Sequence, residues 1–161
     1  MKSKFYLLII AVTLVSCKKK DHEPQPEVQP IVKGKLYGVP FEAKVTIERY
    51  TNFSMNNYKP EDLVSIYISS NPSRSCSSTV EEFSMRLTAP KKVGTYSQND
   101  VYILVNDPRD PTGREGALFS DKNTVITITS VTQDKVIGQV DVKWAENNIE
   151  FKGRFEANVC R

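Results

Sequence analysis

The chain has 161 residues, of which 39% are hydrophobic and 25% are charged, and this composition is typical of a protein with one folded domain. Its formal net charge of +3 includes Lys2 and Lys4, which belong to an N-terminal segment that we expect to be removed. The remaining basic residues do not form the dense positive stripe that binding to a nucleic-acid backbone requires. Nucleic acid is therefore excluded as an expected partner.

The first twenty residues have the layout of an export signal. Apolar residues 5–15 follow the two lysines, and the run leads directly into Leu14-Val15-Ser16-Cys17, which includes its last two residues. A membrane-spanning helix is the alternative, but a span needs about 20 apolar residues and this run is much shorter. The motif resembles the lipobox of Gram-negative lipoproteins. It implies removal of residues 1–16, a diacylglycerol on the Cys17 thiol and a further acyl chain, such as palmitate, on the Cys17 amine.

Residues 17–30 form the predicted lipidated tether. From residue 18 onward they contain three prolines, three acidic residues and almost no apolar residue, which indicates an extended, solvated segment. Lys18-Lys19-Lys20, with Asp21 and Glu23 close behind, resembles the export signals of surface-displayed Bacteroidota-type lipoproteins. We therefore expect an outer-membrane lipoprotein that faces the periplasm or the cell surface and contacts the bilayer through Cys17.

Two cysteines remain once Cys17 carries lipid. In an oxidising compartment such a pair commonly forms a disulfide, so we expect a bond between Cys76 and Cys160. Two free thiols and a metal site are the alternatives. No C-x-x-C pair and no histidine near either cysteine supports the metal site.

From Ile31 to the C-terminus, short runs rich in Val, Ile, Thr and aromatic residues alternate with polar residues, which is typical of antiparallel strands. We expect an all-β domain over residues 31–161, arranged as an antiparallel β-sandwich of about eight strands with meander hairpins. A lipocalin-like β-barrel is the alternative. Helix is confined to one turn near 78–82, where Thr79-Val80-Glu81-Glu82 offers a capping box. The predicted strands cover residues 31–37, 39–50, 63–70, 83–88, 101–106, 124–131, 136–144 and 149–159.

The last predicted strand alternates most clearly. One face carries Ile149, Phe151, Gly153, Phe155, Ala157 and Val159, and the other carries charged and polar residues. Trp144 is in register with Val140 and Val142, so we expect it in the core.

The C-terminal half of the chain resembles small Bacteroidota lipoproteins of unassigned function. The shared pattern consists of Val93-Gly94-Thr95-Tyr96, Ile126-Thr127-Ile128-Thr129, Val136-Ile137-Gly138-Gln139-Val140 and Phe151-Lys152-Gly153-Arg154-Phe155. The resemblance implies strands and turns, and no catalytic residue comes with it.

The residue inventory offers little catalytic chemistry. The one histidine of the sequence, His22, lies in the predicted tether, which excludes a Ser-His-acid triad or a histidine metal site within the fold. Adjacent Glu81 and Glu82 are better explained as surface acids. The loop 106–115 contains several oxygen atoms that could bind calcium, but the positive charges of Arg109 and Arg114 would repel a cation. A proline-rich surface turn is therefore the better explanation of this loop. We expect no catalytic residue, no metal and no cofactor.

One loop combines aromatic and amide side chains, a composition that suits stacking and hydrogen bonding to a sugar or a protein. The alternative is that these residues cap one end of the core. The candidate ligand residues are Tyr50, Asn52, Phe53, Asn56, Asn57 and Tyr58.

Three functional hypotheses follow. The preferred one is a non-catalytic envelope module that binds a protein or glycan partner. The second is a barrel-like carrier of a small apolar ligand, with a cavity lined by Phe41, Val45 and Phe155. The third is a carboxylate-dependent hydrolase, for which the chain provides only scattered acids.

Overall fold

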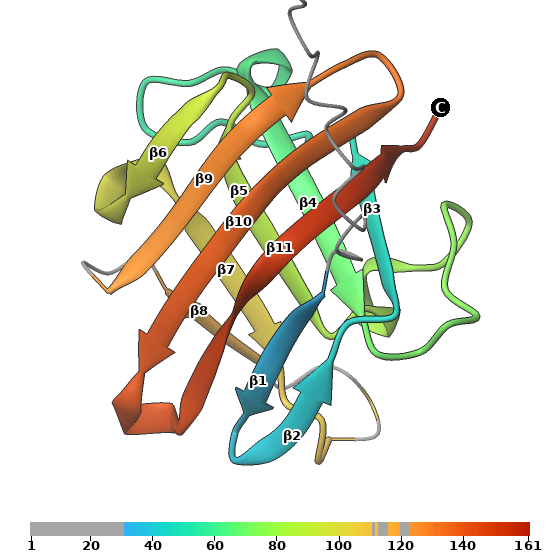
Figure 1. The fold of residues 1–161 in the computed structure, drawn as a ribbon, viewed down its shortest axis with the longest axis vertical. Coiled ribbons are helices and arrows are strands. Elements are labelled where there is room, and N and C mark those ends of the chain that lie inside the picture. Colours follow the sequence, from blue (N-terminus) through green and yellow to red (C-terminus); the bar gives the residue numbers. More distant parts are fainter. Residues whose placement is uncertain (1–30, 111, 113–115, 120–122) are drawn as a thin grey trace, which may run out of the picture.

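The computed structural model describes residues 31–110, 112, 116–119 and 123–161 (Figure 1). The predicted signal, the Cys17 lipidation site, the tether and part of the loop 106–115 lie outside these residues.

The described residues form an 11-stranded sheet, and the prediction of an all-β fold is confirmed. Along the main path the strand order is β6-β9-β10-β11-β3-β4-β5-β7-β8, while β1 pairs with β11 and β2. The strands are β1 (Val32–Leu36), β2 (Val39–Glu42), β3 (Val45–Arg49), β4 (Leu63–Ser69), β5 (Met85–Pro90), β6 (Gly94–Ser97), β7 (Tyr102–Asn106), β8 (Gly116–Phe119), β9 (Thr124–Val131), β10 (Lys135–Trp144) and β11 (Ile149–Val159). Four 3₁₀ turns connect them, η1 (Pro60–Asp62), η2 (Val80–Glu82), η3 (Gln98–Asp100) and η4 (Ala145–Asn147).

The predicted ranges agree with the strands to within two residues at each end, except for 39–50 and for two short strands that were not predicted. The predicted segment 39–50 is two strands, because the chain changes partner at Ala43 and Lys44. The Ala43 N–H donates to the Val32 carbonyl, whereas the Lys44 N–H donates to the Ser69 carbonyl. Strands β6 and β8 were not predicted, because four residues are too few for an alternating pattern to emerge.

The predicted meander of β9, β10 and β11 is confirmed. The β9–β10 turn is closed by Thr132, whose N–H donates to the Lys135 carbonyl at 2.8 Å and whose hydroxyl accepts the Lys135 N–H at 3.0 Å. The β10–β11 connection is the turn η4, and Asn148 leaves it in the left-handed conformation with a φ of 52°.

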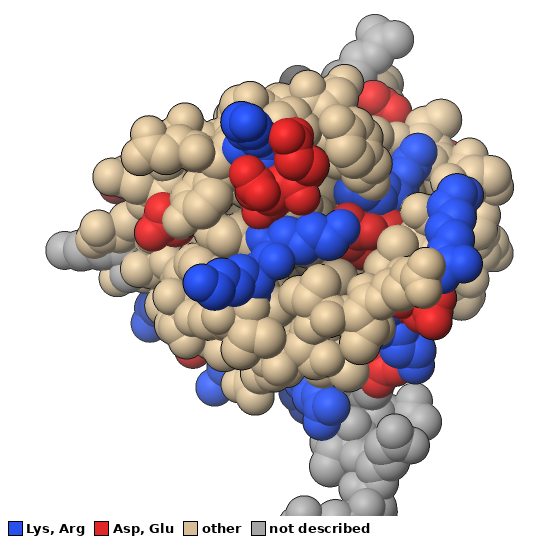
Figure 2. Space-filling view, turned by 90° about the horizontal axis from the view of Figure 1, so that it is seen from above, with Lys and Arg blue, Asp and Glu red and all other residues tan. Residues whose placement is uncertain are grey.

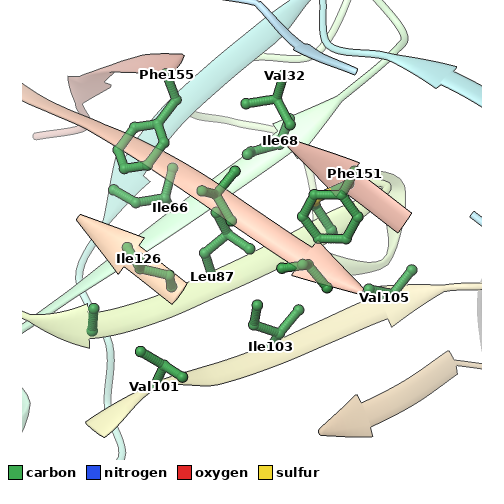
Figure 3. Close-up of a cluster of buried hydrophobic side chains, with 14 of the residues drawn as sticks. Val32, Ile66, Ile68, Leu87, Val101, Ile103, Val105, Ile126, Phe151 and Phe155 are labelled. Atoms are coloured by element: carbon green, nitrogen blue, oxygen red, sulfur yellow. The ribbon is translucent and has the colours of Figure 1, made fainter. Parts of the chain in front are cut away.

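The sheet curls so that β9, β10 and β11 lie across one side of the molecule and β4, β5 and β7 lie behind them (Figure 1). Strand alternation sends one face of each layer inward, where the side chains form one core (Figure 3). Phe151 and Phe155 of β11 meet Ile66 of β4 and Leu87 of β5 there, and each of the four is at most 1% exposed. Trp144 packs against this core from its edge and is half-buried.

Strand β11 joins the two layers. Its first part pairs with β1, from Lys35↔Glu150 to Val32↔Gly153, and its end pairs in parallel with β3 at Asn158 and Val159. Gly153 lies at the point where β1 begins, with a φ of +147°, and a Cβ there would stand 2.0 Å from the Ile31 carbonyl oxygen. Only glycine fits this position.

A smaller apolar cluster lies on the outer face of β3 and β4. Ile47, Tyr67 and Phe83 form it, with the Tyr67 and Phe83 rings edge to face at a centroid distance of 5.4 Å. The segment between β4 and β5 covers this cluster, and Cys76 of that segment is bonded to Cys160, with 5.5 Å between the two Cα atoms. The predicted disulfide is confirmed.

Candidate ligand cleft

The most coherent candidate site is an open cleft at the end of the sheet where β4 begins and β5 ends. Leu63 and Pro90 are cross-strand partners there, so the chain segments beyond them must lie side by side. The cleft has a volume of about 610 Å³, within the usual range for small-ligand sites of roughly 300–1,000 Å³. Its lining residues are Tyr58, Glu61, Asp62, Pro90, Lys91, Lys92 and Tyr96.

Backbone hydrogen bonds hold the two walls of the cleft together. The Lys91 N–H donates to the Asp62 carbonyl at 2.7 Å, which joins the segment after β5 to the turn before β4. On the other side, Met55 and Tyr58 exchange two backbone hydrogen bonds of 3.1 and 2.8 Å. The Asn56 side-chain amide donates to the Asn99 carbonyl, and this bond pins the Met55–Tyr58 turn to η3.

Tyr96 provides an aromatic wall. Its ring is half-buried, packs against the end of the core and covers Gly94, where a Cβ would stand 2.8 Å from the Tyr96 hydroxyl oxygen. That hydroxyl donates to the Lys92 carbonyl at 2.9 Å. Burial, with smaller contributions from Tyr58 and Asp100, raises the pKa of Tyr96, so the hydroxyl stays a neutral donor in any physiological buffer.

Charges of both signs surround the two tyrosines. Lys91 and Lys92 face Glu61 and Asp62 across the cleft, and Figure 2, which looks onto this end of the molecule, shows basic and acidic side chains side by side. Such groups donate and accept hydrogen bonds without giving the cleft a strong net charge.

A buried carboxyl group lies below this end. Glu48 is 4% exposed and is the cross-strand partner of Ile66, so its side chain shares the inner face of the sheet. Burial raises the pKa of Glu48, and the positive charge of Lys91 partly opposes that shift.

The predicted ligand loop is only partly brought to the cleft. Tyr58 lines it, whereas Tyr50 is 71% exposed and lies outside the lining. Phe53 packs on the outer face of the sheet, 5.9 Å from the Tyr102 ring and 5.1 Å beneath the Arg86 guanidinium. The three asparagines Asn52, Asn56 and Asn57 are exposed. The loop is therefore divided between two places, because Phe53 covers the outer face of the sheet and Tyr58 lines the cleft.

The residues proposed for an apolar cavity do not share one. Phe41 and Phe155 belong to the main core, whereas Val45 packs against the separate cluster on the outer face. The three side chains therefore lie on two sides of the sheet.

The acidic residues considered for catalysis or calcium binding form local hydrogen bonds and ion pairs. Glu81 and Glu82 lie in the predicted turn η2, where the Thr79 N–H donates to the Glu82 carboxylate at 2.6 Å. In the loop 106–115, Asp107 accepts the Arg109 side chain, which lowers the pKa of Asp107. The described residues contain no group of three or more His, Cys, Asp or Glu side chains placed to hold a metal.

Sequence reasoning missed Glu61, Asp62, Lys91, Lys92 and Tyr96. The available signal was the pairing of the two predicted strands 63–70 and 83–88 as neighbours, since antiparallel pairing brings the start of one beside the end of the other. Lys59-Pro60-Glu61-Asp62 and Pro90-Lys91-Lys92-Val93 are the turn segments at these two ends.

Comparisons of this chain with protein-family models, with curated protein sequences and with solved structures found no match. Within the part of the chain that the structure describes, no helix has the length and apolar character of a membrane span.

Proposed function

We propose that the protein is a lipid-anchored envelope lipoprotein whose domain is a non-catalytic binding module for a glycan or protein partner. The cleft between β4, β5 and β6 is the binding site. The observation that carries this proposal is the combination of Tyr58 and Tyr96 with charged groups of both signs in one open cleft.

A glycan is the ligand class that this lining fits best. A sugar ring presents a C–H face to an aromatic ring and hydroxyl groups to its surroundings, and the cleft offers tyrosine rings beside carboxylate and ammonium groups. A protein partner would use the same tyrosines as anchors, since Tyr is enriched among the residues that dominate binding energy at interfaces.

Lipid anchoring is proposed from the sequence alone. Leu14-Val15-Ser16-Cys17 supplies the residue that takes the lipid, and residues 18–30 supply a polar spacer between the bilayer and the domain. The location, at the outer membrane and facing the periplasm or the cell surface, is part of the same proposal. Cys17→Ser should move the protein from the membrane fraction to the soluble fraction, and protease treatment of intact cells distinguishes the two faces.

We infer a sandwich-like closure of the sheet rather than a barrel. Among the described residues, β6 and β8 end the strand path and no pairing joins them, while the layers are connected by a two-residue parallel pairing of β11 with β3. The space between the layers is filled by packed side chains (Figure 3). This packing disfavours the carrier hypothesis, and an apolar fluorescent probe should not bind to the folded protein.

The test is a glycan-array measurement with three single variants. Tyr58→Ala and Tyr96→Ala should each weaken binding of the best glycan by about tenfold or more, as expected for an anchor residue in a binding site. Tyr50→Ala is the matched control, because Tyr50 belongs to the same loop but lies outside the cleft and is 71% exposed. Equal losses from Tyr50→Ala and Tyr58→Ala, or unchanged binding by all three variants, would contradict the assignment of the cleft.

A further inference from the structure

The outer face of β1, β10 and β11 carries an excess of positive charge. In and next to the part of this face where the three strands lie side by side, the basic residues are Lys33, Lys35, Lys143, Lys152 and Arg154, and the acidic residues are Asp141 and Glu150; together we call them the basic face. The ion-paired Lys135 and Glu156 lie on the same face of the sheet but beyond β1, toward the other end of β10 and β11. The register places the residues of the basic face on one surface, because Lys33 is the partner of Lys152 and Lys152 is the partner of Asp141. They alternate with buried residues such as Phe151, so they point away from the core.

The cations of the basic face outnumber the acidic residues beside them, although Lys33 is the cross-strand partner of Glu42, Lys143 of Glu150 and Lys152 of Asp141. Lys35 lies 3.9 Å from Glu150, but Lys33, Lys143, Lys152 and Arg154 form no ion pair among the described residues. Lys33 and Lys152 stand directly opposite each other on neighbouring antiparallel strands, an arrangement of like charges that destabilises a sheet. An anion bound between them removes that repulsion.

The shape of the basic face favours a flat partner over a single extended chain. Its cations come from three adjacent strands, which spreads them over about 10 Å across the sheet. Two shallow hollows lie on this surface, and both include Lys33 and Lys152 in their linings.

The chain also enters the domain at this face. The Ile31 carbonyl oxygen lies against Gly153, between Lys152 and Arg154 in the sequence, and the Ile31 side chain is 41% exposed. Residues 17–30 reach at most about 50 Å when fully extended, so a lipid on Cys17 keeps the basic face close to the membrane.

We infer that the basic face docks on the phosphate-bearing, anionic headgroups of the membrane that carries the lipid anchor. The proximity argument rests on the proposed lipid anchoring, whereas the charge argument does not. Docking this face presents the opposite side of the domain, and the loops at the end with the ligand cleft, to the surrounding space. Electrostatic attraction to an anionic bilayer contributes about a fivefold preference for each basic residue near the surface.

The test uses the full lipidated chain in vesicles of neutral lipid alone or with anionic phosphatidylglycerol. A water-soluble amine reagent labels exposed lysines, and mass spectrometry follows each one. In anionic vesicles at low salt, labelling of Lys35 and Lys143 should slow by about tenfold, while labelling of Lys92 stays unchanged. High salt should abolish the difference, because it screens exposed charges.

Two triple variants make the test specific. The first variant changes Lys33, Lys152 and Arg154 to Gln, and it should remove the protection of Lys35 and Lys143. The matched control changes Lys59, Lys91 and Arg161 to Gln, which removes the same charge from residues outside β1, β10 and β11, and it should keep the protection. Three results would overturn the inference. The lysines could be labelled equally in both vesicle types, or both triple variants could lose the protection of Lys35 and Lys143 equally. A soluble acidic polysaccharide could also protect these lysines as strongly as the vesicles do. Flotation of the chain with neutral vesicles at high salt reports lipid anchoring separately, and labelling with added anionic vesicles at low salt still decides the docking if the chain does not float with the neutral ones.

Discussion

Removing the disulfide should destabilise the domain mainly through its unfolded state. Cys76 and Cys160 are 84 positions apart, and closing a loop of that length lowers the entropy of the unfolded chain by an amount equivalent to roughly 4.5 kcal/mol at 25 °C. Measured losses for native disulfides run from about 2 to 5 kcal/mol, against a total stability of about 5–15 kcal/mol. The double variant Cys76→Ser/Cys160→Ser should therefore lose a large part of its free energy of unfolding.

The folded state should change little, because other contacts hold the covering segment. The Arg49 guanidinium donates to the Ser78 carbonyl at 2.7 Å, and the Asn106 side-chain amide donates to the Phe83 carbonyl at 2.7 Å. Urea unfolding followed by circular dichroism measures the loss, and near-ultraviolet dichroism reports whether the Tyr67–Phe83 pair stays in place. A loss under about 1 kcal/mol, or a collapse of the aromatic signal before global unfolding, would refute the entropic reasoning.

Three further changes have defined outcomes. Gly153→Ala should cost at least about 2 kcal/mol in urea unfolding, since its φ is unfavourable and its Cβ meets the Ile31 carbonyl, whereas Lys152→Ala should be nearly neutral. Leu87→Ala should cost about 2–5 kcal/mol, because Leu87 is 0% exposed, and an equal cost for half-buried Leu104→Ala would contradict that reasoning. Burial raises the pKa of Glu48, so the stability of the protein falls as pH rises through the folded-state pKa of this group. Glu48→Gln should therefore stabilise the protein at pH 7 but not at pH 4. If the variant and the wild type differ by the same free energy of unfolding at both pH values, burial of the charge is excluded as the cause.

The sequence predicted the fold best where one strand has enough residues to show which face is buried. Ranges 124–131 and 149–159 agree with β9 and β11, because each alternates over at least eight residues. The split at Ala43 was not visible, since Phe41 and Val45 continue the same alternation while the backbone changes partner. That change depends on hydrogen bonds to Val32 and Ser69, which are remote in sequence.

The candidate site was less predictable than the fold. The loop 50–58 was identified by its aromatic and amide composition, but composition does not tell which side chain faces which surface. Phe53 is held on the outer sheet by Arg86 and Tyr102, and only Tyr58 reaches the cleft. Strand pairing places Lys91 and Tyr96 in the site, and the chemical character of a single residue does not reveal which strands pair.

The position of β11 in the chain has a consequence for folding. Strand β11 follows β1, β3 and β10 in the sequence, yet it pairs with all three and provides the connection between the two layers. The final cysteine of the chain is also the one that fixes the segment covering the outer cluster. The two layers can therefore join only once residues 149–159 are present, so a product truncated before residue 149 lacks the strand on which both layers depend.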